Sequence, residues 1–300
     1  MKRVLITRAV FPEIVEALSK CFDVEHNADD TPWAPDELAR RLAGKHGAMA
    51  TVMDKFDAAI LAQRPDLKVI SNIAVGYNNI DVPAATRSGI RVTNTPGVLD
   101  DTTADLTWAL LMAAARRIAE GDAYVRAGDW KIAFGVQYFL GQDIHHATLG
   151  IIGMGRIGQA IARRAMGFDM RVLYHNRTRL PQADEQRLGA TWVERDVLLA
   201  HADFVVVMAP YSPATHHLIG AAEIAKMKPT AVLVNTARGG VVDDAALVEA
   251  LKAKRIAAAG LDVFEGEPRV NPGYLELRNV VMTPHVGSAS RATRMLMCNT

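Results

Sequence analysis

Leu149 to Gly158 reads Leu-Gly-Ile-Ile-Gly-Met-Gly-Arg-Ile-Gly, and this stretch decides the fold of the chain around it. A short apolar strand runs directly into a G-x-G-x-x-G pattern, and a helix is expected to follow over residues 156–166. In this context Gly153 permits a tight turn, Gly155 lets the main chain approach a pyrophosphate, and the last glycine lets strand and helix pack closely.

The glycine pattern is common by itself, so a tight turn without a ligand is the alternative interpretation. The flanking strand and helix favour a dinucleotide, because free N–H groups and the helix dipole attract its phosphates. We expect contacts to the cofactor from all residues of the turn: Gly153, Met154, Gly155, Arg156, Ile157 and Gly158.

The end of the next expected strand, residues 170–174, decides between NAD and NADP. A carboxylate about 20 residues beyond the turn would grip the ribose diol of NAD. No Asp or Glu occurs between Met170 and Ala183, whereas Asn176, Arg177 and Thr178 follow the strand. These side chains suit a 2′-phosphate, so we expect NADP(H) to be preferred and NAD(H) to be possible. A solvated basic loop is the alternative.

Short apolar runs alternate with helical patterns on both sides of this turn. The runs predict parallel strands covered by helices, and their continuous apolar character predicts burial on both faces. A long helix is expected over residues 102–119. The expected strands are residues 4–7, 22–25, 48–52, 67–74, 91–94, 149–153, 170–174, 204–208, 231–235, 257–263 and 280–283.

Composition restricts the function. The chain has 300 residues, 50% hydrophobic and 22% charged, with 34 Lys and Arg against 33 Asp and Glu. This balance is that of a globular protein and shows no basic excess for nucleic acid. The longest apolar stretch, residues 106–115, is too short to span a membrane and predicts a buried helix. Cys21 and Cys298 offer neither a disulfide framework nor a metal site, which favours a reducing cytoplasm.

Four polar side chains follow the later strands. Arg238, Asp262, Glu267 and His285 all come after apolar runs that are expected to be neighbouring strands. Ligands of doubly wound sheets bind outside the carboxyl ends of the strands, so these residues should face the dinucleotide. Each alone would more often be an ordinary surface or loop residue. Together with the glycine turn they predict a catalytic site.

At these motifs the chain resembles the D-isomer-specific 2-hydroxyacid dehydrogenases, close to the glyoxylate/hydroxypyruvate reductase and 2-ketogluconate reductase branch. The resemblance covers nearly the whole chain. The motifs that carry it are Val75-Gly-Tyr-Asn-Asn-Ile-Asp81, Gly153-Met-Gly-Arg-Ile-Gly158, Asn235-Thr-Ala-Arg-Gly239, Gly260-Leu-Asp-Val-Phe264 with Glu267-Pro268, and Pro284-His-Val-Gly287.

The resemblance implies a Rossmann nucleotide-binding domain, residues 99–286, inserted into a flavodoxin-like substrate domain formed by residues 1–98 and 287–300. It implies His285 as proton donor, Glu267 as its partner and Arg238 as substrate anchor, and Asp262 at the nicotinamide end. Substrate would also contact Val75 and Gly76. Further cofactor contacts are implied for Thr103, Pro210, Thr215, Thr236, Ala237 and Gly287.

The residue types fit the chemistry. Hydride addition to a 2-keto acid creates an alkoxide, which an imidazolium can protonate in the same step. A carboxylate beside the ring stabilises its charged form and orients it. An arginine can bind the substrate carboxylate and polarise the carbonyl. The expected substrate is hydroxypyruvate, glyoxylate or 2-ketogluconate.

The sequence is also compared with three alternative functions on this scaffold. A formate dehydrogenase on this scaffold would pair the histidine with Gln, which Glu267 argues against. A phosphonate dehydrogenase carries the same trio, and a nucleotide-sensing co-repressor keeps the scaffold. The adjacent pairs His145–His146 and His216–His217 should point apart, so no metal site is expected.

The resemblance and the glycine-bounded segment 128–141 imply a homodimer. The family's chains usually continue past Thr300 with a last helix that returns to the first domain, and we expect that helix to be lacking here.

Overall fold

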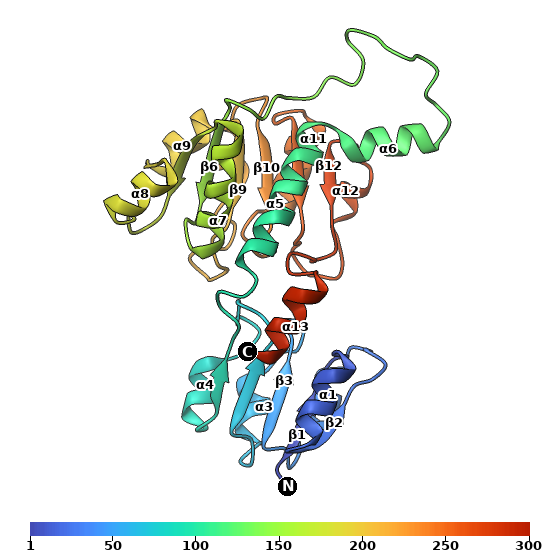
Figure 1. The fold of residues 1–300 in the computed structure, drawn as a ribbon, viewed down its shortest axis with the longest axis vertical. Coiled ribbons are helices and arrows are strands. Elements are labelled where there is room, and N and C mark those ends of the chain that lie inside the picture. Colours follow the sequence, from blue (N-terminus) through green and yellow to red (C-terminus); the bar gives the residue numbers. More distant parts are fainter. The chain divides into compact units, whose positions relative to one another are not determined.

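Every strand of the chain pairs in parallel with its neighbours, in two separate sheets. The computed structural model describes residues 1–300 and divides into two compact units. Met1–Leu99 and Ala289–Thr300 form the smaller unit, and Asp100–Ser288 form the larger one (Figure 1). The expected α/β class with two doubly wound parallel sheets is confirmed. No helix is long and apolar enough to cross a membrane.

The smaller unit has a five-stranded sheet in the order β2-β1-β3-β4-β5, which is the flavodoxin-like order. Its strands are β1 (Arg3–Ile6), β2 (Asp23–His26), β3 (Gly47–Ala50), β4 (Val69–Asn72) and β5 (Arg91–Thr93). Its helices are α1 (Pro12–Ser19), α2 (Pro35–Arg41), α3 (Ala58–Ala62), α4 (Val82–Arg87) and α13 (Arg291–Asn299).

The last residues of the chain form a helix that the sequence analysis did not predict. Helix α13 covers residues 291–299 and belongs to the smaller unit. Arg291 forms an ion pair with Glu13 at 2.7 Å and lies over the Phe11 ring at 4.8 Å, while Met297 is buried. Most apolar residues of this helix are consecutive, at 295–298, and show no helical periodicity, so its N-cap Ser290 is the main local signal in the sequence.

The larger unit has a seven-stranded sheet in the order β12-β11-β10-β9-β6-β7-β8, so the chain turns from one half of the sheet to the other beside β6. Its strands are β6 (Thr148–Ile152), β7 (Arg171–His175), β8 (Ala190–Trp192), β9 (Phe204–Val207), β10 (Val232–Asn235), β11 (Ala258–Leu261) and β12 (Val280–Met282). Strands β9, β10 and β11 are buried along their whole length, as their unbroken apolar runs predict.

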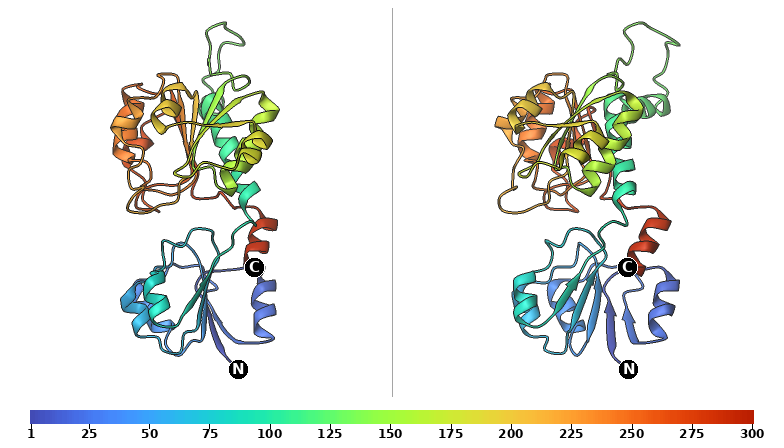
Figure 2. Two further views of the ribbon diagram at one scale, coloured as in Figure 1. Left: turned by 90° about the vertical axis from the view of Figure 1, so that its left-hand side faces the viewer. Right: turned by 60° about the vertical axis from the view of Figure 1, so that its left-hand side comes forward.

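Helices cover both faces of this sheet (Figure 2). They are α5 (Asp100–Ala115), α6 (Ile118–Arg126), α7 (Arg156–Ala165), the 3₁₀ turn η1 (Met166–Phe168), α8 (Gln182–Leu188), α9 (Arg195–His201), α10 (Ala221–Ile224), α11 (Asp244–Lys252) and α12 (Pro272–Leu275). The buried side chains of α5, including Trp108, pack in the cluster that contains β6 and α7, and the Trp108 indole N–H donates to the Ile161 carbonyl at 3.1 Å.

The single helix expected over residues 102–119 is wrong. It ends at Ala115, and α6 begins at Ile118. Arg117 interrupts it with φ of 54°, a left-handed conformation that no α-helix accommodates. The Arg117 guanidinium binds Glu120 in the next turn at 2.8 Å and lies 4.7 Å from the Phe139 ring, so one local ion pair and one tertiary contact accompany the break.

Candidate active site

The glycine turn lies between β6 and α7 and has the geometry of an anion cradle. Gly153 has φ of +106°, and a Cβ there would lie 2.6 Å from the Met208 carbonyl carbon. A Cβ on Gly158 would overlap the Gly153 carbonyl oxygen. A Cβ on Gly155 would meet nothing within 4 Å. Two of the glycines therefore allow close packing, and the third leaves open space above the helix N-terminus.

The first turn of α7 has no side-chain cap, and its N–H groups have no partner within the helix. Not every N–H of the glycine turn is free, however. The Met154 N–H donates to the Asn176 Oδ1 at 2.7 Å. The amide oxygen of Asn176, which was expected to contact the cofactor, therefore connects the residue after β7 to the glycine turn. Only its NH₂ group remains for a cofactor. The donors left for a phosphate belong to the start of α7.

The two arginines that follow β7, Arg177 and Arg179, differ in whether a protein group binds them. Arg179 binds Glu185 through two hydrogen bonds of 2.7 and 2.8 Å, and Tyr174 donates to the same carboxylate at 2.6 Å. The Arg179 hydrogen bond, followed by that of Tyr174, lowers the pKa of Glu185 to about 2. Arg177 and Thr178 are exposed. Arg177 is thus the arginine of this segment without a protein partner.

The structure brings Glu267 and His285 into direct contact. His285 Nδ1 lies 2.7 Å from Glu267 Oε2, and the other carboxylate oxygen accepts from the Phe264 N–H at 2.8 Å. Burial acts to raise the pKa of the Glu267 carboxyl, but the hydrogen bond and charge of the imidazole outweigh it and lower that pKa. The carboxylate is therefore ionised at neutral pH, and the second ring nitrogen, Nε2, stays free.

Asp262 shapes the loop that carries the histidine. Its buried carboxylate accepts hydrogen bonds from Thr283 Oγ1 at 2.6 Å, from the Val286 N–H at 2.8 Å and from the Gly287 N–H at 2.8 Å. The His285 N–H donates to the Asp262 carbonyl at 2.9 Å, and φ of 54° turns the histidine out of the extended strand direction. Asp262, implied at the nicotinamide end, has its carboxylate occupied by this loop.

Arg238 follows β10 in the loop Asn235–Gly239. Its guanidinium makes one hydrogen bond to protein, from Nη1 to the Ala237 carbonyl at 2.9 Å, although it has five N–H donors. Burial lowers the pKa of Arg238, and the charge of Glu267 opposes that shift. Asn235 holds the loop by donating to the Arg238 carbonyl at 3.1 Å. A half-buried cation with spare donors can bind an anion.

The other expected cofactor residues lie at the same edge of the larger unit. Thr236 Oγ1 lies 2.7 Å from Thr107 Oγ1. A Cβ on Gly287 would lie 3.5 Å from the Thr103 hydroxyl oxygen. Thr215 donates to the Pro210 carbonyl at 2.7 Å, which closes the loop after β9.

In the smaller unit, Val75 and Gly76 follow β4. Their carbonyls accept from Asn94 at 2.9 Å and from Asn72 at 2.9 Å, while their N–H groups donate no hydrogen bond within this unit.

Asp244 supports the loop that carries Glu267, and it is not among the residues predicted from the sequence. Asp244, at the start of α11, is buried and accepts from the Tyr274 hydroxyl at 3.1 Å and from the Glu265 N–H at 2.9 Å. It fixes the chain two residues before Glu267. Burial raises the pKa of Asp244 despite these hydrogen bonds. The sequence signal is weak, because an acidic residue in the first turn of a helix is usually a surface feature.

The expectation that adjacent histidines point apart is wrong for both pairs, because the two rings of each pair are in contact. The rings of His216 and His217 are stacked, with centroids 3.9 Å apart and planes at 24°. His145 and His146 are edge-on at 5.1 Å and 81°.

Comparisons with known proteins agree with this geometry. Residues 108–287 match the family model described as D-isomer specific 2-hydroxyacid dehydrogenase, NAD binding domain. A glyoxylate reductase from Thermococcus litoralis is 47% identical over 297 residues, which cover 97% of this chain and 89% of the relative.

Solved structures of similar proteins share the fold of this chain. The TT0316 protein from Thermus thermophilus has a TM-score of 0.91 at 44% identity, covering 99% of this chain and 93% of that one. An NADPH-dependent glyoxylate/hydroxypyruvate reductase from Sinorhizobium meliloti, in complex with NADP and malonate, has a TM-score of 0.88 at 33% identity, covering 99% and 90%. The chain therefore belongs to the D-isomer specific 2-hydroxyacid dehydrogenase family.

Proposed function

We propose that the protein reduces a small 2-keto acid, such as glyoxylate, hydroxypyruvate or 2-ketogluconate, to the D-2-hydroxy acid, with NADPH preferred over NADH. The observation that carries this proposal is the 2.7 Å contact between His285 and Glu267, which leaves one imidazole nitrogen free. The names of the relatives support the substrate class.

The nicotinamide cofactor, when bound, supplies a hydride to the keto carbon. The glycine turn and the uncapped first turn of α7 would hold its phosphates. Glu267 accepts a hydrogen bond from Nδ1 of protonated His285, so Nε2 carries the proton that the product alkoxide needs. Arg238 binds the substrate anion and polarises the carbonyl with its spare donors. In the smaller unit, the free N–H groups of Val75 and Gly76 can donate to a carboxylate.

A substrate panel tests the proposal. NADPH oxidation at 340 nm is measured with glyoxylate, hydroxypyruvate, 2-ketogluconate and pyruvate, and at least one should be reduced at a typical enzyme rate of about 1–10³ s⁻¹. Cofactor binding without reduction of any keto acid would favour the nucleotide-sensing alternative. Oxidation of a phosphonate in preference to any hydroxy acid would favour the phosphonate dehydrogenase.

The preference for NADPH rests on Arg177. It is exposed and without a protein partner, whereas Arg179 is bound to Glu185, and no carboxylate follows β7 to grip a ribose diol. Arg177→Ala should weaken NADPH binding roughly 10- to 150-fold, as expected for a lost charge-assisted contact of about 1.5–3 kcal/mol, and leave NADH binding nearly unchanged. Fluorescence titration of both cofactors measures this.

Arg171→Ala is the matched control, because Arg171 is an exposed arginine at the opposite end of β7. It should leave both affinities unchanged. Equal affinity of the unmodified protein for NADPH and NADH would disprove the preference.

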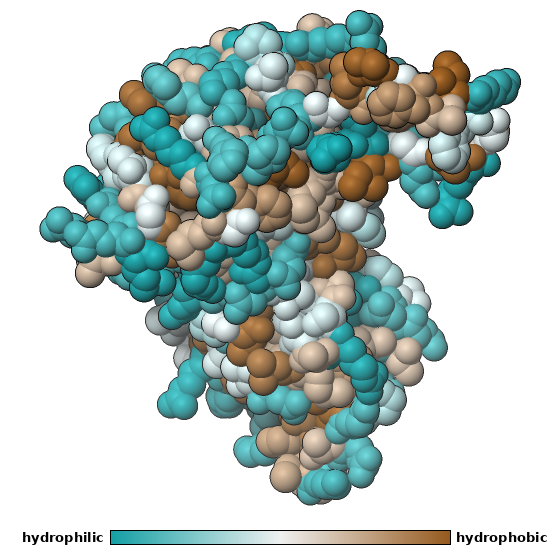
Figure 3. Space-filling view, turned by 45° about the horizontal axis from the view of Figure 1, so that its top comes forward, coloured by the Kyte–Doolittle hydropathy of each residue, from teal (hydrophilic) through white to brown (hydrophobic).

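We also propose a homodimer, formed through α6 and the segment 127–141. This part of the chain exposes seven large apolar side chains, each by more than half: Ile118, Val125, Trp130, Ile132, Phe134, Val136 and Leu140. They gather on the projecting part at the right of the space-filling view (Figure 3). Apolar exposure on this scale is typical of an interface, and a second copy is the usual occupant of a closed symmetric assembly.

Light scattering should give twice the chain mass of 32.6 kDa. Phe134→Asp combined with Val136→Asp should yield monomers, because these side chains are 83% and 81% exposed in the single chain. Leu275→Asp, at a 71% exposed leucine in α12, is the control and should remain dimeric. A monomeric unmodified protein would refute the dimer.

We further propose a cytoplasmic location, because both cysteines are free thiols.

A further inference from the structure

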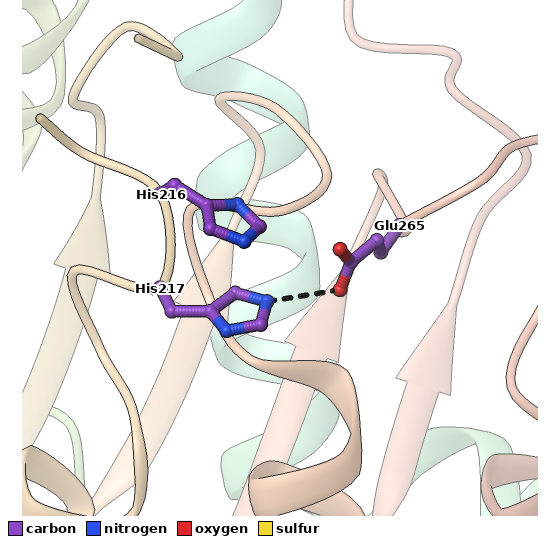
Figure 4. A group of neighbouring side chains, drawn as sticks. All are labelled: His216, His217 and Glu265. Atoms are coloured by element: carbon purple, nitrogen blue, oxygen red, sulfur yellow. Dashed lines mark hydrogen bonds and ion pairs between the residues drawn. The ribbon is translucent and has the colours of Figure 1, made fainter. Parts of the chain in front are cut away.

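Two loops at the carboxyl edge of the larger sheet meet at His216, His217 and Glu265. The histidines lie in the loop after β9, and the glutamate lies in the loop after β11 (Figure 4). His217 Nε2 is 3.1 Å from Glu265 Oε2. One ligand atom from each of the three residues lies within 4.8 Å of the others. The residues take no part in the proposed reduction.

The backbone brings the two imidazoles together. His217 has φ of 50°, and this left-handed conformation turns its side chain to the same side as that of His216. The conformation is held by main-chain hydrogen bonds from the His217 N–H to the Gly240 carbonyl at 2.8 Å and from the Ile219 N–H to the Val241 carbonyl at 3.2 Å. The Glu265 N–H is bound by Asp244 at 2.9 Å. The site is therefore built on anchored main chain.

We propose that His216, His217 and Glu265 bind a divalent transition-metal ion, with Zn²⁺ as the best fit. Two imidazoles and one carboxylate with an open fourth position are a common zinc ligand set. Bond lengths of about 2.0–2.2 Å place tetrahedral ligand atoms roughly 3.3–3.6 Å apart. The 3.1 Å pair is already near that separation, and the exposed side chains of His216 and Glu265 can rotate to complete it.

In both histidines a neighbouring oxygen lies near Nδ1, which leaves Nε2 to bind the ion. His217 Nδ1 is 3.6 Å from Asp243 Oδ2, and His216 Nδ1 is 3.4 Å from the Tyr211 hydroxyl. Metal-bound histidines usually direct their second nitrogen to such an oxygen, which orients the ring. Asp243 is itself fixed, because Oδ1 caps α11 by accepting from the Ala246 N–H at 3.0 Å. Imidazole ligands favour Zn²⁺, Co²⁺, Ni²⁺ or Cu²⁺ over Mg²⁺ and Ca²⁺.

The test uses the full-length protein without an affinity tag, stripped with a chelator and free of cofactor. Zn²⁺ binding is measured by competition with a chromogenic chelator, and Co²⁺ binding by its visible absorption. We expect one ion per chain and an intense tetrahedral Co²⁺ spectrum. His216→Ala, Glu265→Gln and His217→Asn should each weaken Zn²⁺ binding at least ~10-fold. Loss of a residue that only supports a metal ligand already weakens binding by about 10- to 100-fold, and these three residues are the ligands themselves. Asparagine is chosen because it tolerates positive φ.

His146→Asn is the matched control. His146 is also the second histidine of an adjacent pair and also has positive φ, 61°, but it belongs to no cluster of potential ligands. It should bind Zn²⁺ as the unmodified protein does. Absence of a one-to-one site, equal binding by all four variants, or loss of binding in His146→Asn would overturn the proposal. Because no enzymatic rate is measured, these outcomes are independent of the proposed reductase activity.

Discussion

His285→Ala is expected to lower the turnover of keto acid reduction by ~10²–10⁴-fold, which is the usual contribution of a positioned general acid. Glu267 is the side chain that hydrogen-bonds to the ring, and the free Nε2 is the proton source in the proposed reaction. NADPH affinity should survive, because the phosphate contacts lie at the glycine turn. Single-turnover kinetics and a fluorescence titration separate the two effects.

The pH profile tests the Glu267 partnership. Reduction of the keto acid consumes a proton, so its rate should fall as pH rises. Oxidation of the hydroxy acid releases a proton, so its rate should rise over the same range. The pKa of Glu267 is lowered, so the carboxylate is charged there and stabilises the imidazolium. Glu267→Gln removes that charge and should move both limbs to lower pH. An unmoved profile would mean that the carboxylate only supports the loop.

His201→Ala is the control for both variants, because His201 is exposed and its ring contacts only the Val197 carbonyl in its own helix. Its turnover and profile should match those of the unmodified protein. Near-normal turnover of His285→Ala would show that another group or water delivers the proton.

Arg238→Gln should lower kcat/KM for the keto acid by ~10²–10³-fold, the range observed when one donor to a developing oxyanion is removed. Glutamine keeps a hydrogen-bonding amide but removes the positive charge and the paired donors of the guanidinium. Arg238→Lys should recover part of the loss, because it restores the charge without the planar fork. Steady-state kinetics with the best substrate of the panel measure both variants.

Arg269→Gln provides the comparison for Arg238, since Arg269 is an exposed arginine in the loop that carries Glu267. It should leave kcat/KM unchanged. A similar loss in both variants would point to a general effect of positive charge on the approach of the anionic substrate. NADPH affinity should remain the same in all three variants, which separates substrate binding from cofactor binding.

The sequence by itself determined the features that follow from local rules. The turn Gly153–Gly158 needs glycine where a Cβ would strike main chain, and a strand and helix flank it, so its position could be predicted from residue order. The parallel sheets followed from unbroken apolar runs in β9, β10 and β11. Short elements such as α8 and β8 could not be predicted from the sequence, because a few residues give too weak a periodicity.

Only the tertiary structure decided how polar side chains divide their hydrogen bonds. Arg177 and Arg179 are indistinguishable in sequence, yet only Arg179 has Glu185 beside it. Asp262 is expected from the sequence to face the cofactor, but its carboxylate accepts three hydrogen bonds from the loop after β12. His217 faces the same way as His216 because positive φ, held by contacts to the loop after β10, reverses the usual divergence. The contacts of Asp262 and His217 depend on partners far away in the chain, which no local pattern encodes. Arg179 and Glu185 are near in sequence, and their contact depends on how the chain turns between β7 and α8.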